Sequence, residues 1–98
     1  MWILETNDPD TERLTFRVPS GSVKTIGRST GAEFMIDAAL VSRLHCQLTA
    51  TAISLHVKDL ESTNGTFVNG TRVQAAELYE GDRLSVGRVD LIVSRKTN

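Results

Sequence analysis

Residues 59–70 read Asp59-Leu60-Glu61-Ser62-Thr63-Asn64-Gly65-Thr66-Phe67-Val68-Asn69-Gly70, a polar stretch with two turn signals. Asn64-Gly65 and Asn69-Gly70 favour tight turns because both residue types tolerate positive φ. Such turns typically join short antiparallel strands, and Asn69-Gly70 in particular predicts a hairpin. The stretch therefore indicates an all-β fold whose turns present hydroxyl and amide groups.

Period-two alternation of apolar and polar residues recurs on both sides of this stretch, which is the signature of half-buried strands. Each run is short and bounded by turn residues, so we expect a two-sheet β-sandwich. No window carries a helical stripe, and residues 38–41 and 74–79 are expected to form at most single helical turns. The expected strands cover residues 2–6, 12–18, 23–26, 44–50, 53–57, 84–86 and 89–93.

The alternation also predicts which side chains face the core. In the run 44–50 it places Leu44, Cys46 and Leu48 inward and His45 on the opposite side. In the run 53–57 it places Ile53 inward with its apolar neighbours.

Composition limits the possible functions. The 98 residues suit one domain, expected to span residues 1–98, with 40 % apolar and 23 % charged residues. A net charge of −1 offers no broad basic surface for nucleic acid or an anionic membrane, and no apolar run approaches the ~18 residues of a membrane span. Cys46, the single cysteine, cannot form an internal disulfide, which suits a reducing compartment.

Three polar turns carry the residue types that bind phosphate. Arg28 precedes the hydroxyl-rich turn 29–31, Ser42-Arg43 lies before a strand, and Thr63-Asn64 lies in a third turn. An arginine fork supplies several donors in one plane, and hydroxyl and amide groups can bond the remaining oxygens or a peptide backbone. If these turns meet at one end of the sandwich, they form a phosphate-binding pocket on a rigid scaffold.

His45 is open to three interpretations. It could be a general base paired with Ser42, a metal ligand, or a residue that braces the loops. A metal site has only His56 as a second histidine and no clear carboxylate partner, so we expect no bound metal. A hydrolase built on Ser42, His45 and Asp59 would lack a strained nucleophile turn and a recognisable oxyanion hole. The bracing role is favoured, and we assign no catalytic residue.

These motifs resemble the forkhead-associated (FHA) domain, a module that reads phosphothreonine. The resemblance covers about residues 23–93, and it implies about eleven short strands, with binding loops at one end and both termini at the other. The matching segments are Gly27-Arg28, Ser42-Arg43-Leu44-His45, Asp59-Leu60-Glu61-Ser62-Thr63-Asn64-Gly65-Thr66, Asn69-Gly70 and Gly81-Asp82-Arg83-Leu84.

The resemblance also implies individual roles. Arg28 would bind the phosphate directly, with Ser42 and Thr63 donating to the same group. Asn64 would hold the main chain of the ligand, and Arg43 would contact the phosphate or the peptide.

Four further residues, Gly27, His45, Gly65 and Asn69, would hold the loops in shape. Leu40 stands where some members place a residue that reads the third ligand position after the phosphate, and an apolar group there suggests no strong demand for an acidic ligand residue.

The expected partner is a phosphothreonine-containing protein or peptide in a kinase-dependent signalling interaction. We expect no cofactor and no enzyme activity, and a monomeric domain that can be part of a larger protein. The expected compartment is the bacterial cytoplasm, with the eukaryotic cytosol or nucleus as alternatives. Alternative functions are a phosphate-independent interaction scaffold of the same fold, and the hydrolase described above.

Overall fold

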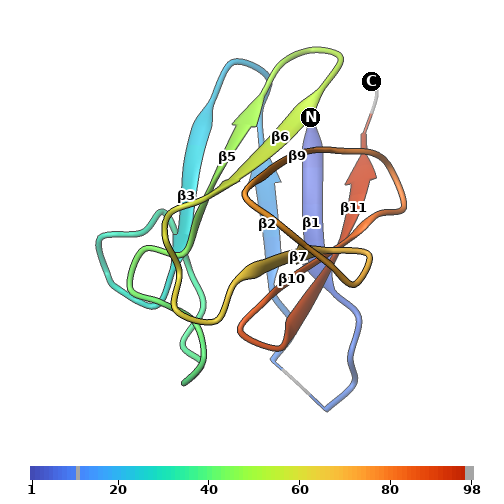
Figure 1. Cartoon of the computed structure of the whole chain (residues 1–98). Helices are drawn as coiled ribbons and strands as arrows, with labels where there is room; N and C mark the ends of the chain where they lie inside the picture. Colours follow the sequence, from blue (N-terminus) through green and yellow to red (C-terminus); the bar gives the residue numbers. More distant parts are fainter. Residues whose placement is uncertain (11, 97–98) are drawn as a thin grey trace.

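Two β-sheets pack face to face in the computed structural model, which describes residues 1–10 and 12–96 (Figure 1). Over these residues the chain forms strands and turns but no helix, so the prediction of an all-β two-sheet sandwich is confirmed. The eleven strands of this described part are β1 (Trp2–Thr6), β2 (Thr15–Val18), β3 (Val23–Gly27), β4 (Phe34–Met35), β5 (Cys46–Ala50), β6 (Leu55–Asp59), β7 (Thr66–Val68), β8 (Thr71–Val73), β9 (Ala75–Leu78), β10 (Arg83–Val86) and β11 (Val89–Arg95).

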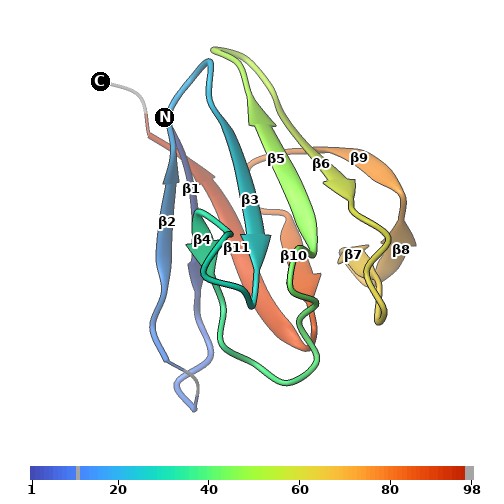
Figure 2. The same ribbon diagram turned by 90° about the vertical axis from the view of Figure 1, so that its left-hand side faces the viewer.

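The two chain ends lie at one end of the sandwich, and the loop from β4 to β5 lies at the other. One sheet has the order β2-β1-β11-β10-β7-β8 and the other β4-β3-β5-β6-β9. Because β1 pairs with β11, Met1 and Lys96 lie side by side. The N-terminal ammonium group of Met1 donates to the Lys96 carbonyl at 3.0 Å, and the Lys96 N–H donates to the Met1 carbonyl at 2.8 Å. Figure 2 shows the first residue at one end of the sandwich and the loop from β4 to β5 at the opposite end.

The core lies between the sheets and consists of the inward residues of both. Leu4, Leu48, Leu84 and Leu91 are completely buried, and the Phe16 and Phe34 rings stack at 4.5 Å across one side of the core. The hydrophobic effect of this burial, rather than hydrogen bonding alone, favours the folded chain.

Strand β5 begins later than the alternation predicted, and the burial of Leu44 and His45 is the reverse of the prediction as a result. Leu44 is 50 % exposed and His45 is completely buried, so the predicted inward Leu44 and outward His45 are wrong. The reason is that regular pairing starts only at Cys46, opposite Asp59. Residues 44 and 45 still follow the path of the preceding loop, where the two-residue period does not apply.

Three other boundaries differ from prediction. Within residues 74–79 the chain forms strand β9 (Ala75–Leu78), paired with β6, instead of a helical turn, because pairing with a neighbouring strand outweighs local preference. Ile53 is 79 % exposed since it lies in a turn closed by the N–H group of Thr51 and the carbonyl of Ser54 at 2.8 Å. Strand β2 begins at Thr15 rather than residue 12.

Asn69 and Gly70 form the two-residue turn between β7 and β8. Their φ angles are 50° and 86°, the positive pair that a type I′ hairpin requires. The Asn69 side chain also accepts the N–H of Arg83 at 2.9 Å and donates to Asp82 at 3.0 Å. It thereby joins this hairpin to the turn before β10.

Leu48→Ala and Leu44→Ala form a matched pair that tests the register of β5. Leu48 is buried in the central strand, so its truncation is expected to cost about 2–5 kcal/mol of unfolding free energy. Leu44 is half exposed, and its truncation is expected to change that energy by no more than about 0.5 kcal/mol. Urea denaturation measures both, and equal losses would contradict the register described here.

Candidate functional site

Two adjoining clefts at the loop end of the sandwich share the side chain of Arg28. One has a volume of about 150 Å³ and includes Ser42, Thr63 and Asn64 in its lining. The other, of about 290 Å³, is lined by Arg28, Ser29, Thr30 and Arg43. The structure thus brings four of the five predicted ligand-binding residues into one cleft, and it places Arg43 in the neighbouring one.

Arg28 is held in place through its backbone and one side-chain nitrogen. Its N–H group donates to the Ser42 carbonyl at 2.9 Å, and its Nε donates to the Val41 carbonyl at 3.0 Å. Within the described residues it forms no ion pair, and the side chain is exposed. The two terminal nitrogens of the guanidinium therefore remain available to an anion.

Gly27 permits the close approach that positions Arg28. A Cβ atom at residue 27 would lie 2.0 Å from the backbone oxygen of Arg43, far inside van der Waals contact. The end of β3 therefore lies directly against the backbone of the loop from β4 to β5. The Ile36 N–H group also donates to the Gly27 carbonyl at 2.9 Å.

Ser42 and Asn64 each use one polar atom within the protein and keep another free. The Ser42 hydroxyl oxygen accepts the N–H of Thr63 at 3.0 Å, which leaves its proton to donate elsewhere. Asn64 donates its side-chain amide to the Leu40 carbonyl at 2.9 Å, which leaves its Oδ1 atom as an acceptor. The hydroxyl of exposed Thr63 makes no hydrogen bond with another described residue.

His45 connects two loops from inside the protein. Its Nδ1 atom lies 3.0 Å from the N–H of Ser42, and its Nε2 atom lies 2.8 Å from the Gly65 carbonyl. Because a backbone N–H can only donate, Nδ1 must accept, and the ring proton is on Nε2. Gly65 has φ 92°, and a Cβ there would approach the Arg72 side chain to 2.8 Å.

A buried carboxylate organises the turn that carries Thr63 and Asn64. Asp59 accepts hydrogen bonds from the Ser62 hydroxyl at 2.5 Å, the Ser62 N–H at 3.1 Å and the Thr66 hydroxyl at 2.7 Å. Burial raises the pKa of Asp59, but these hydrogen bonds together outweigh it and hold the pKa below the ordinary value. The Ser62 oxygen in turn accepts the Gly65 N–H at 3.0 Å.

The groups imagined for a hydrolase are not arranged as a catalytic triad. His45 is hydrogen-bonded to the backbone N–H of Ser42 and not to its hydroxyl, and Asp59 is bonded to Ser62 and Thr66. In the same interior, burial and the nearby Asp59 charge raise the pKa of the Cys46 thiol to about 12. The thiol is thus protonated and packs as a core residue.

The sequence interpretation missed several contributors to the site. The carbonyls of Leu40 and Val41 orient Asn64 and Arg28, and backbone groups leave no signal in a residue pattern. Gly87 had no expected role in the site, although a Cβ there would lie 2.6 Å from the backbone of Leu40 and Val41. A third cleft of about 390 Å³, lined by Leu40, Asn64, Phe67, Gly87 and Arg88, adjoins the first on the Asn64 side.

Comparison with known proteins matches this architecture to a family. The FHA domain family matches residues 24–87. The ABC transporter ATP-binding/permease protein Rv1747 of Mycobacterium tuberculosis is 42 % identical over 85 residues, which are 87 % of this chain but 10 % of that protein. This chain therefore spans about a tenth of the length of that relative.

Two solved structures show the same fold at comparable identity. The FHA domain of FhaA, crystallised with the intracellular domain of Rv3910, gives a TM-score of 0.84 at 32 % identity and covers 95 % of this chain and 99 % of that one. A structure from a study of phosphothreonine-dependent FHA domain interactions gives a TM-score of 0.85 at 31 % identity and covers 99 and 98 %.

The chain belongs to the FHA domain family, and the resemblance noted from its motifs is confirmed. The FHA domains among its structural relatives act as interaction modules. No helix in residues 1–10 or 12–96 is long and apolar enough to cross a membrane.

Gly27→Ala tests the close approach of β3 to the loop from β4 to β5. The new methyl group would collide with the Arg43 carbonyl, so we expect a loss of about 1–3 kcal/mol in unfolding free energy. Gly31→Ala is the matched control, because its Cβ would meet only the Ser29 side chain at 3.5 Å. Thermal denaturation followed by circular dichroism compares them, and equal melting temperatures would disprove the packing.

Asp59→Asn tests the buried carboxylate. The amide accepts fewer hydrogen bonds, so the variant is expected to lose about 1–3 kcal/mol at neutral pH. The pKa of Asp59 is lower in the folded chain than the value of about 3.9 expected for an unfolded chain. The ionised carboxylate therefore stabilises the fold above that pH, and this contribution is lost as the pH falls through the pKa of the folded state.

The difference in unfolding free energy between wild type and Asp59→Asn should consequently be largest near neutral pH and should become smaller below about pH 4. Urea denaturation across this range measures it. Exposed Glu80→Gln is the control and should change little at any pH. A difference that stays constant with pH would show that the Asp59 charge does not contribute.

Proposed function

We propose that this chain is a phosphothreonine-binding module that mediates phosphorylation-dependent protein–protein interaction. The observation that carries the proposal is the Arg28 guanidinium, whose terminal nitrogens form no ion pair with a described residue, in one cleft with the hydroxyl groups of Ser42 and Thr63, which each keep a proton to donate. A phosphate group carries about −1.5 to −2 charges near neutral pH and offers three acceptor oxygens. Family membership and a relative from work on phosphothreonine-dependent interactions support the same conclusion.

The donors available match the acceptors of a phosphate. Arg28 donates from its terminal nitrogens, while its Nε remains on Val41 and keeps the fork oriented. Ser42 donates its hydroxyl proton while its oxygen stays on Thr63. Arg43, in the adjoining cleft, adds positive charge on the other side of Arg28.

The peptide that carries the phosphate is held through its main chain. Asn64 keeps its Oδ1 atom free, so it accepts a backbone N–H of an extended ligand. The neighbouring cleft with Leu40, Phe67 and Arg88 lies on the Asn64 side and receives ligand side chains near the phosphothreonine. In this arrangement Gly27, His45, Gly65 and Asn69 act on the loops and not on the ligand.

The expected affinity follows from the number of charged contacts. Each charge-assisted hydrogen bond contributes roughly 1.5–3 kcal/mol before the costs of ordering and desolvation. Three or four such bonds support micromolar binding, or about −8 kcal/mol. An unphosphorylated threonine forms none of them, so a kinase controls the interaction. The event is reversible capture, without catalysis.

The domain as a whole is proposed to act as one unit over residues 1–98. Its partner is a phosphothreonine-containing protein, and the domain can serve within a longer polypeptide. Its proposed compartment is the bacterial cytoplasm. No specific observation favours the hydrolase or a scaffold that ignores phosphate.

Arg28→Ala tests the proposed function directly. Removal of the fork takes away at least two charge-assisted bonds, so phosphothreonine peptides should bind at least about 100-fold more weakly. Isothermal titration calorimetry with peptides selected from an oriented phosphothreonine library measures the loss. Arg17→Ala, an exposed arginine on β2, is the matched control and should bind like the wild type.

Circular dichroism of Arg28→Ala should show an unchanged fold because the side chain is exposed. Equal affinity of wild type and Arg28→Ala would overturn the assignment of Arg28. Binding of unphosphorylated peptides as tight as that of phosphorylated ones would favour the phosphate-independent scaffold instead.

A further inference from the structure

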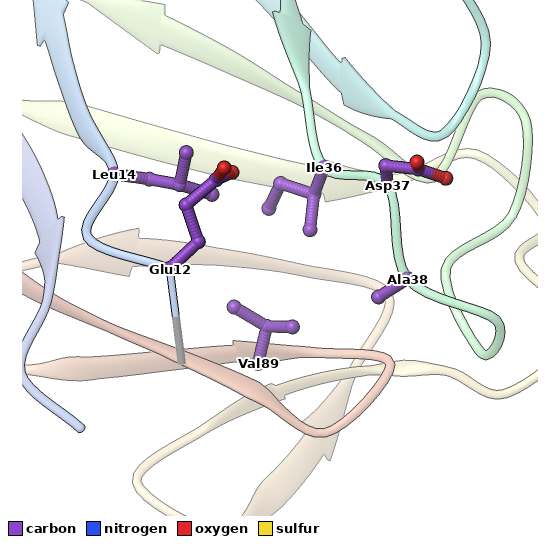
Figure 3. Close-up of a pocket in the computed structure, with 6 residues that line it drawn as sticks. All are labelled: Glu12, Leu14, Ile36, Asp37, Ala38 and Val89. Carbon is purple, nitrogen blue, oxygen red and sulfur yellow. The ribbon is translucent and has the colours of Figure 1, made fainter. Parts of the chain in front are cut away.

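A separate cleft of about 220 Å³ lies on the flank of the sandwich, between the segment before β2, the segment after β4 and the start of β11 (Figure 3). None of its lining residues belongs to the two clefts that share Arg28. Its lining consists of Glu12, Leu14, Ile36, Asp37, Ala38 and Val89.

The lining of this flank cleft is mainly apolar. Leu14, Ala38 and Val89 are half-buried and pack against the core, and Ile36 is buried. Figure 3 shows these four side chains surrounding the hollow. A hydrocarbon chain that enters the cleft would therefore cover partly exposed apolar surface, which the hydrophobic effect favours.

The charge of the lining is entirely negative. Glu12 extends its carboxylate to the side where Leu14 and Ile36 lie, and Asp37 stands at the rim with its carboxylate directed away from the hollow (Figure 3). Both are exposed, and neither carboxylate forms an ion pair or hydrogen bond with another described residue.

In the described part of the chain, the basic residues nearest in sequence form no ion pair with these carboxylates and line other clefts. Arg13 follows Glu12 but lines a different cleft with Glu5 and Ile92. Arg88 precedes Val89 but lines the cleft beside Asn64. The flank cleft thus combines an apolar wall with two unpaired negative charges, and the complementary ligand has an aliphatic stem and a cationic end.

We propose that the flank cleft is a second docking site, which receives an arginine side chain of a partner protein. The methylene groups of the arginine pack on Leu14, Ile36 and Val89, and its guanidinium pairs with Glu12, while Asp37 adds negative charge at the rim of the cleft. Arginine suits a partly apolar cleft better than lysine because its guanidinium is more weakly hydrated and bonds carboxylates in a planar fork.

The position of this site explains what a second contact adds. Asp37 and Ala38 begin the turn whose Leu40 and Val41 carbonyls hold Asn64 and Arg28. A partner bound at the loops can therefore reach the flank with another part of its surface. Linked contacts raise overall affinity without any new interaction at the first site.

The test uses a peptide without phosphate, so its outcome is independent of the proposed phosphothreonine site. The probe is acetyl-Gly-Gly-Arg-Gly-Gly-amide, titrated into the ¹⁵N-labelled protein and followed by NMR. The expected result is a set of saturable shifts in the amides of residues 12–14, 36–38 and 89. The same peptide with citrulline, which keeps the shape but not the charge, should give much smaller shifts.

Charge-removing variants complete the experiment. The double variant Glu12→Gln with Asp37→Asn should bind the arginine peptide at least about threefold more weakly, and both sites are exposed, so the fold should persist. Glu80→Gln is the control for loss of an unrelated exposed carboxylate and should bind normally. A lysine peptide should bind more weakly than the arginine peptide.

Any of the following outcomes would overturn the proposal. The first is no shift at the lining residues, the second is equal shifts with arginine and citrulline, and the third is unchanged affinity in the double variant. Shifts spread over all acidic surfaces would also exclude a specific site. Because no phosphate is used, any of these results leaves the Arg28 assignment unaffected.

Discussion

The binding end of this domain depends on one buried imidazole. His45 accepts the Ser42 N–H on one side and donates to the Gly65 carbonyl on the other, so it fixes the loop before β5 against the loop before β7. Two exposed hydrogen bonds join the same loops, from the Thr63 N–H to the Ser42 hydroxyl and from the Asn64 amide to the Leu40 carbonyl, and His45 adds the buried connection between them. A buried polar bridge is rigid because each unpaired group would cost free energy in the interior.

The polar groups of the loops divide into two sets. Asp59, Ser62 and Thr66 are buried and bond to one another or to backbone, and they give the turns their shape. Arg28 and Asn64 are exposed, and each uses one nitrogen to anchor its side chain. The remaining atoms of the second set point to solvent with fixed directions, which lowers the entropy cost of binding a ligand.

The sequence predicted the two-sheet fold and the turn residues well, because alternation and Asn-Gly pairs are local signals. The sequence-based predictions were wrong where the local pattern does not match the path of the backbone in the folded chain. Leu44 and His45 follow a loop rather than a strand, so the two-residue period gave the wrong sides. Residues 75–78 form a strand because they pair with β6, and the sequence of this segment does not show that a partner strand is available.

The sequence predicted which turns meet at one end of the sandwich, but not the contacts that orient their side chains. Side-chain donors such as Arg28 can be recognised from their motifs, whereas the Leu40 and Val41 carbonyls that orient them depend on backbone geometry. Gly27 and Gly87 are required because a Cβ atom at either position would collide with the backbone of a neighbouring loop. The flank cleft joins three segments distant in sequence, and no single motif marks it.

The pairing of β1 with β11 has an architectural consequence. Met1 and Lys96 lie at adjacent points, at the end of the sandwich opposite the loop from β4 to β5 (Figure 2). A domain of this kind can be inserted within a longer polypeptide, because its two points of attachment are close together. The flanking segments of such a polypeptide would attach at that end and would not cover the two clefts that share Arg28.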